Sequence, residues 1–232
     1  MIYYTMKTLV INAYPDRAAK YDSNYELIDA IWWEDITDDI LSKYHFRYNC
    51  KIELRKKICA CSESHKAVLK KIIDEDLHDV CILEDDCIVK DMELLKEIVK
   101  ILPEDFVYLG GQINSCLVKD YNTFTDKKLH IIENIKKDNN LIKTIEPEKY
   151  RITHACSYFI KNKNVAMKIL SSIDDVYSNR KYRAIDVAYY ELQKKGIIKY
   201  FVFPALGTLH IPDARRGFTY STYKLDNDQL EY

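Results

Sequence analysis

The pattern of apolar and polar residues along the chain predicts strands that alternate with helices. Apolar runs of strand length occur at residues 7–12, 25–33, 80–83, 106–111, 113–118, 129–133, 153–160 and 197–203. Apolar residues at helical spacing instead predict helices at residues 38–44, 63–74, 92–102 and 164–171, and from residue 184 onward. This alternation favours one α/β domain in which helices cover a sheet.

Two of the predicted helices carry specific expectations about their side chains. The helix at residues 63–74 is expected to begin after Ser62 as its N-cap, which places His65 in its first turn. The helix at residues 92–102 is expected to bury one face made of Leu94, Leu95, Ile98 and Ile101.

Three adjacent carboxylates follow the most apolar of the predicted strands. Residues 80–83 are typical of a strand buried on both faces, and Glu84, Asp85 and Asp86 come directly after them. In open α/β sheets ligands bind outside the carboxyl ends of strands. An extended chain would place Glu84 and Asp86 on one side and Asp85 on the other, which suits a Mg²⁺ or Mn²⁺ ion that holds a diphosphate. The alternative is an acidic strand-to-helix turn in which Asp86 caps the helix.

Several isolated residues are further candidates, each with a functional and a structural interpretation. Arg17 follows the first predicted strand and is either a diphosphate ligand or a surface helix residue. His65 is either a ligand-binding or a packing residue. Gly110 and Gly111 mark a turn that either admits a ligand or is merely tight. Asp186 either stabilises a helix N-terminus by about 0.3–1 kcal/mol or acts as a catalytic base.

Length, charge and the N-terminal residues narrow the class of protein. A chain of 232 residues with 47% hydrophobic residues is expected to form a single domain over residues 1–232, with a polar tail at 208–232. The net charge of -1 argues against a protein that binds nucleic acid mainly through phosphate neutralisation. No apolar run approaches the ~18 residues of a membrane span, and no signal peptide is recognisable. We therefore expect a cytoplasmic protein, in the host cytoplasm if the source is a virus.

The cysteines are expected to be reduced, because seven is an odd number and several lie in apolar segments. Cys59, Cys61, Cys81 and Cys87 raise the alternative of a zinc site. Their spacing matches no common pattern of zinc ligands, which disfavours that alternative.

Taken in order, short motifs of the chain resemble glycosyltransferase family 25 from about residue 7 to about residue 207. The family includes lipooligosaccharide galactosyltransferases and collagen hydroxylysine galactosyltransferases. The chain departs from the family pattern at Ala60, Cys156 and Ala184, mainly on the acceptor side. The matching motifs are Val10-Ile11-Asn12 with Asp16-Arg17, Asp29-Ala30, Cys61-x-x-Ser64-His65, Leu83-Glu84-Asp85-Asp86, Tyr108-Leu109-Gly110-Gly111, Thr153-His154-Ala155, Ala166 with Leu170, and Ile185-Asp186.

The resemblance implies a GT-A type fold with a Rossmann-like mixed sheet. It also implies a nucleotide-sugar donor, and among such donors it favours a UDP-sugar. It implies transfer of a hexose, galactose or glucose, with inversion to a hydroxyl of a glycan or glycosylated protein. Asp186 would be the base, and Asp86 would bind Mn²⁺ or Mg²⁺ together with Glu84, with Asp85 as the alternative second ligand. Two alternatives stay open: a degenerate sugar-nucleotide-binding protein and a metal-dependent phosphodiesterase. The positions implied to bind the donor are Asn12, Arg17, Ala30, His65, Asp85, Gly110, Gly111 and His154.

Overall fold

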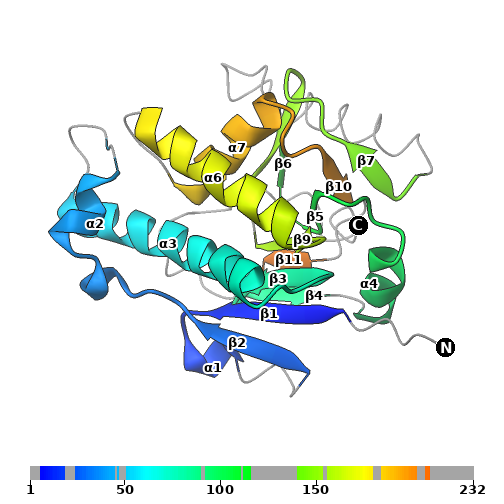
Figure 1. Cartoon of the computed structure of the whole chain (residues 1–232), viewed down its shortest axis with the longest axis horizontal. Coiled ribbons are helices and arrows are strands. Elements are labelled where there is room, and N and C mark those ends of the chain that lie inside the picture. Colours follow the sequence, from blue (N-terminus) through cyan, green and yellow to red (C-terminus); the bar gives the residue numbers. More distant parts are fainter. Residues whose placement is uncertain are drawn as a thin grey trace, which may run out of the picture.

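The main feature of the fold is a seven-stranded mixed sheet with the strand order β2-β1-β3-β9-β5-β10-β7 (Figure 1). The strands β2, β1 and β3 are parallel, and β9 runs antiparallel between β3 and β5. The bounds are β1 (Lys7–Asn12), β2 (Tyr25–Asp29), β3 (Val80–Glu84), β5 (Phe106–Tyr108), β7 (Ile142–Thr144), β9 (Ser157–Ile160) and β10 (Tyr200–Val202). The computed structural model describes residues 6–18, 24–44, 46, 51–89, 92–110, 112–115, 140–153, 156–179, 184–202 and 207–209.

Helices and two small sheets complete the described part of the chain. The antiparallel pairs are β4 (Cys87–Val89) with β11 (Gly207–Leu209), and β6 (Gln112–Ser115) with β8 (Tyr150–Thr153). The helices are α1 (Pro15–Ala18), the 3-10 helix η1 (Trp33–Asp35), α2 (Asp38–Ser42), α3 (Ile52–Asp74), α4 (Met92–Val99), α6 (Lys163–Asn179) and α7 (Ile185–Lys194). The predicted α/β class with a mixed sheet is confirmed.

Helices cover the sheet on both faces, as the two-residue period of its strands requires. Val80 and Ile82 of β3 pack into the core under α3, α6 and α7, which lie together on one side of the sheet in Figure 1. Cys81 of the same strand points the other way and packs with the residues of α4. The continuous apolar run of β3 is therefore explained by burial on both faces, as predicted.

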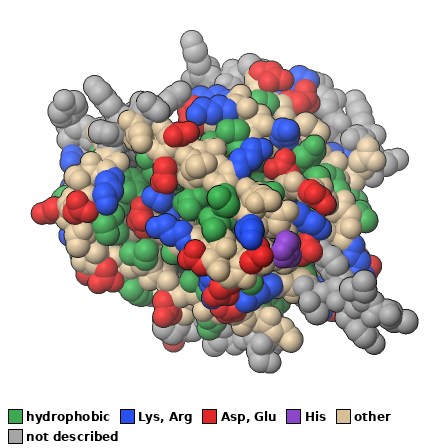
Figure 2. Space-filling view, in the orientation of Figure 1, with side chains coloured by type: hydrophobic (Ala, Val, Ile, Leu, Met, Phe, Trp, Pro, Cys, Tyr) green, Lys and Arg blue, Asp and Glu red, His purple; other side chains and the backbone are tan. Residues whose placement is uncertain are grey.

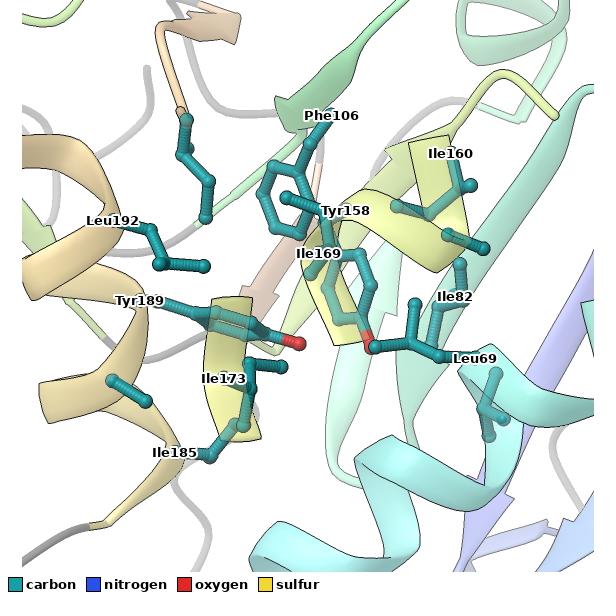
Figure 3. Packing of buried hydrophobic residues seen from close by; sticks show 14 of the residues in the cluster. Leu69, Ile82, Phe106, Tyr158, Ile160, Ile169, Ile173, Ile185, Tyr189 and Leu192 are labelled. Carbon is teal, nitrogen blue, oxygen red and sulfur yellow. The ribbon is translucent and has the colours of Figure 1, made fainter. Parts of the chain in front are cut away.

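Aromatic side chains fill the larger core and fix α7 against the sheet (Figure 3). Tyr158 of β9 stacks on Phe106 of β5 with 4.9 Å between ring centroids, and Tyr189 of α7 meets Tyr158 edge-on at 5.8 Å. All three side chains are fully buried, and each such burial contributes about 1.5–3 kcal/mol. The first turn of α7, with Asp186, is held in place by this packing.

The predicted start of α3 at residue 63 is wrong, because the helix begins at Ile52. Residues 52–61 contain no glycine or proline, so nothing in this segment prevents the helix from extending toward the N-terminus. Ser62 is therefore a buried residue inside the helix and not its N-cap. His65 lies in the middle of α3 and not in its first turn.

Some other predicted boundaries and one predicted helix face also need correction. Of the face predicted for α4, Leu95 and Ile98 are buried as expected, whereas Leu94 and Ile101 are exposed. Val99 and, just after the helix, Leu102 join the buried residues in their place. The single strand expected at residues 153–160 is two strands, β8 and β9. The strand expected at 25–33 ends at Asp29, and the helix expected at 164–171 continues to Asn179. Residues 129–133, and the predicted tail except 208–209, lie outside the described residues.

The surface gives no sign of a strongly basic face in the view of Figure 2. Acidic and basic side chains are interspersed there, in keeping with the net charge of -1. Within the described residues, no helix combines the length and apolar character that crossing a membrane requires. The cytoplasmic location expected from the sequence stays a prediction.

Candidate active site

The candidate site lies where the parallel strands β2, β1 and β3 end. Their register pairs Asn12 with Asp29 and Ile11 with Glu84, so the carboxyl ends of the three strands form one edge. Ligands of open α/β sheets bind outside such an edge. The acidic residues that follow β3 therefore stand where the sequence predicted them.

Asp85 and Asp86 form a tight turn between β3 and β4. The alternative interpretation, a strand-to-helix turn in which Asp86 caps the helix, is wrong, because a strand and not a helix follows Asp86. The alternating directions expected for Glu84, Asp85 and Asp86 apply only to an extended chain, and β3 ends at Glu84. The directions of these carboxylates must be taken from their contacts.

The Asp85 carboxylate holds the loop that follows β1. It is almost fully buried, and its Oδ2 atom accepts hydrogen bonds from the backbone N–H groups of Ala13 at 2.9 Å and Tyr14 at 2.7 Å. Hydrogen bonds to an ionised carboxylate are stronger than neutral ones. The contacts give Asp85 a positioning role, and its contact with a donor stays a prediction.

Arg17 faces the acidic turn from α1. Its Nη1 atom lies 3.4 Å from Asp85 Oδ1 and 3.8 Å from Asp86 Oδ2, and its guanidinium group lies 4.3 Å from the ring centroid of Tyr14. The side chain remains partly exposed beside the turn. Of the two interpretations of Arg17, the contacts favour a residue of the site over an ordinary surface residue.

His65 and Glu84 are joined in a buried chain of hydrogen bonds. His65 is 1% exposed, and its Nε2 atom lies 3.0 Å from Glu84 Oε1, whereas its Nδ1 atom lies 2.9 Å from the hydroxyl oxygen of Tyr158. An ionised carboxylate only accepts, so Nε2–H donates to Glu84. In the neutral imidazole Nδ1 then accepts from the Tyr158 hydroxyl. His65 is thus a buried residue that orients Glu84.

Ser64 connects the middle of α3 to the segment after β2. Its Oγ accepts a hydrogen bond of 2.9 Å from the Ile31 backbone N–H and donates one of 2.8 Å to the carbonyl oxygen of Ala60. Next to this segment, the Ala30 N–H donates to the Asn12 carbonyl oxygen at 2.9 Å. Ala30 and Asn12 therefore lie at the same edge of the sheet as the acidic turn.

Asp186 joins the site from the other half of the sequence. The side chain of Cys61 reaches solvent, yet desolvation raises the pKa of its thiol well above the usual value, and the carboxylates of Glu84, Asp186 and Asp86 raise it further. Burial also raises the pKa of Tyr108, with the Asp186 carboxylate as the next cause. The three carboxylates are thus near enough to act on one thiol.

Gln193 anchors α7 to the strands beside it. Its Oε1 accepts from the Ile152 backbone N–H at 3.0 Å, and its Nε2 donates to the Ile152 carbonyl oxygen at 2.8 Å and to the Tyr108 hydroxyl at 3.1 Å. The side chain is buried, so all these bonds are shielded from water. Gln193 was not among the residues predicted from the sequence; its place four residues after Tyr189, on the same face of a helix, is the feature that could have indicated burial.

The four-cysteine zinc site weighed from the sequence is not formed. Cys59, Cys81 and Cys87 are buried in three different apolar clusters, and Cys61 is exposed and belongs to none of them. The cysteines within the described ranges are free thiols, as expected. Of the remaining predicted positions, Gly110 is buried beyond β5, and Gly111 and His154 lie outside the described residues.

The residues at the acidic turn fit a hard divalent cation. The side chains of Glu84 and Asp86 are 28% and 21% exposed, so an ion can reach them. The buried Asn12 Oδ1 atom has no hydrogen-bond partner among the described residues. Carboxylate and amide oxygens are ligands that Mg²⁺ and Mn²⁺ prefer.

Fold and site together define an α/β protein with an acidic ligand site at the carboxyl ends of parallel strands. The chain belongs to glycosyltransferase family 25 (LPS biosynthesis protein), whose family model matches residues 12–188. The match includes every predicted site residue from Asn12 to Asp186, and it supports glycosyltransferase activity. A comparison with curated proteins gives no match.

Proposed function

We propose that the protein transfers galactose or glucose from a UDP-sugar to a hydroxyl of a glycan or glycoprotein, with inversion at the anomeric carbon. The observation that carries the proposal is the pair of partly exposed carboxylates, Glu84 and Asp86, at the carboxyl edge of three parallel strands. Asp186 is near enough to this pair to raise the pKa of the same thiol, that of Cys61. One group of carboxylates can bind the donor's cation while another acts as a base. A glycosyltransferase needs both functions next to each other.

Donor binding is assigned to the acidic turn and the residues around it. Glu84 and Asp86 would hold Mn²⁺ or Mg²⁺, which supplies positive charge to the leaving diphosphate. Arg17 lies beside the same turn and adds a second positive charge for the phosphates. His65 keeps the Glu84 carboxylate in one orientation through the bond from Nε2–H. The contacts of Glu84 with His65 and of Arg17 with Asp85 support this assignment.

Asp186 is assigned as the general base. Its carboxylate removes the proton of the acceptor hydroxyl while the hydroxyl oxygen forms a bond to the anomeric carbon. The bond from that carbon to the diphosphate oxygen breaks, and the nucleoside diphosphate leaves with the electron pair. Attack and departure occur on opposite faces, so a single displacement inverts the configuration.

A thermal-unfolding screen of nucleotide sugars, with and without Mn²⁺, tests the proposal. A donor at about 100 times its dissociation constant should stabilise the fold by about 2.7 kcal/mol, and only when Mn²⁺ is present. Stabilisation without turnover in the presence of acceptor glycans would indicate the degenerate binding protein. Hydrolysis of phosphodiesters without any stabilisation by nucleotide sugars would instead indicate the phosphodiesterase.

A further inference from the structure

A second set of ligand atoms lies beside the acidic turn. The Cys61 thiol sulphur, a His65 ring nitrogen and a Glu84 carboxylate oxygen all lie within 4.8 Å of one another. Cys61 and His65 are four residues apart on α3 and therefore share one helix face. Glu84 reaches the same place from the end of β3. The set thus combines sulphur, nitrogen and oxygen on two rigid elements.

We propose that Cys61, His65 and Glu84 form a binding site for a zinc-class cation, such as Zn²⁺ or Co²⁺. Thiolate and imidazole ligands select such ions over Mg²⁺ and Mn²⁺, which prefer oxygen. Three protein ligands with a fourth position left to water are the number found in open zinc sites. The accessible Cys61 side chain gives the ion a route from solvent.

The surroundings of His65 suit a ligand of this kind. A metal-binding histidine generally donates its second ring N–H to a fixed partner. The hydroxyl oxygen of Tyr158 lies 2.9 Å from Nδ1. When Nε2 binds the ion, Nε2 carries no proton and Nδ1 does. The Nδ1–H group then donates a hydrogen bond to the Tyr158 hydroxyl oxygen. The coordinating Cys61 thiol also loses its proton to solvent, because a bound cation deprotonates a thiol ligand.

Glu84 belongs to both proposed ion sites, so a zinc-class ion should affect sugar transfer. Glu84 would serve both the zinc-class ion and the Mn²⁺ or Mg²⁺ ion of the proposed donor site, so the two ions compete for it. Micromolar Zn²⁺ should therefore inhibit sugar transfer, and this inhibition should weaken in Cys61→Ser. The competition rests on the proposed function, whereas the binding of a zinc-class ion does not.

Titration of the chelator-treated protein with Co²⁺ tests the site directly, because a thiolate bound to Co²⁺ absorbs in the near ultraviolet. We expect the thiolate band to saturate at one ion per chain and Zn²⁺ to abolish it. Cys61→Ser should lose the band. Cys59→Ala, which changes a buried cysteine of the same helix, should keep it. Tyr158→Phe should weaken Co²⁺ binding about 10- to 100-fold through the loss of the partner of His65.

Two results would overturn the inference: no thiolate band in the parent protein, or a band that survives Cys61→Ser. Asp86→Asn separates this outcome from a failure of the proposed function. That variant keeps all three ligands of the zinc-class site and should retain the Co²⁺ band. It should at the same time lose donor binding that depends on Mn²⁺.

Discussion

At the scale of single residues, the three carboxylates of the acidic triplet have different environments. Asp85 is buried and takes its hydrogen bonds from the β1–α1 loop, whereas Glu84 and Asp86 remain partly exposed. Adjacent residues of the same charge thus divide into one that holds the loop and two that can meet a ligand. This division leads to opposite expectations for their substitution.

Replacement of Asp85 should mainly destabilise the fold. Asp85→Ala leaves the partly buried N–H groups of Ala13 and Tyr14 without their acceptor, which should lower the free energy of unfolding by about 1–3 kcal/mol. Urea unfolding followed by circular dichroism measures the loss. Glu97→Ala, which removes an exposed ion pair with Lys100, should change the free energy by less than about 0.5 kcal/mol. Equal effects of the two substitutions on the free energy of unfolding would contradict the positioning role assigned to Asp85.

His65 should contribute to both stability and donor binding. In His65→Ala the buried Tyr158 hydroxyl loses a partner and Glu84 is no longer oriented, so we expect a loss of about 2–4 kcal/mol in unfolding free energy. The affinity of folded molecules for the Mn²⁺-bound donor should also fall. Normal donor affinity per folded molecule would leave His65 with a packing role alone.

Asp186 should matter for turnover more than for binding. Asp186→Asn keeps the shape of the side chain but removes the base, so transfer should slow about 10²- to 10⁴-fold. Donor affinity should stay nearly normal, because proton removal contributes only in the transition state. Steady-state transfer assays and donor titrations on the same preparation make the comparison. Turnover near the parent rate would leave Asp186 only with the role of stabilising the N-terminus of α7.

At the scale of elements, the sequence predicted β1, β3 and α7 well because local patterns determine them. An apolar run followed by charge marks β3, and Asp186 does lie in the first turn of its helix. The start of α3 was misjudged, since a serine inside a helix has the same sequence appearance as an N-cap. The contact of Ser64 with Ile31 and those of Tyr158 with His65 and of Gln193 with its partners could not be predicted, because the paired residues lie 33 to 93 positions apart in sequence.

Gln193 should determine the position of the whole helix α7. Gln193→Ala removes the partners of both backbone polar groups of Ile152 and should cost about 2–4 kcal/mol of unfolding free energy. Because α7 also holds Asp186, the rate of transfer should fall more than donor affinity does. Lys195→Ala, at the exposed end of α7, serves as the control and should leave both quantities unchanged. Loss of stability without any change in transfer rate would separate Gln193 from catalysis.

At the scale of the whole molecule, the site joins two parts of the chain. The acidic turn belongs to the first half, with β1, β2, β3 and α3, whereas Asp186 comes on α7 from the second half. The central sheet and the aromatic core between α3, α6 and α7 bring the two parts together (Figures 1 and 3). The residues of the proposed cation site and the proposed base therefore come together only in the folded chain.

Calorimetric titration of a UDP-sugar into the parent protein and Asp86→Asn, each with and without Mn²⁺, tests the proposed cation-dependent donor site most directly. We expect the parent to bind the UDP-sugar only with Mn²⁺. Asp86→Asn should lose that binding at unchanged unfolding free energy, because the substitution preserves shape and removes an anionic ligand. Donor affinity that is the same in both proteins, or the same with and without Mn²⁺, would contradict the proposed site.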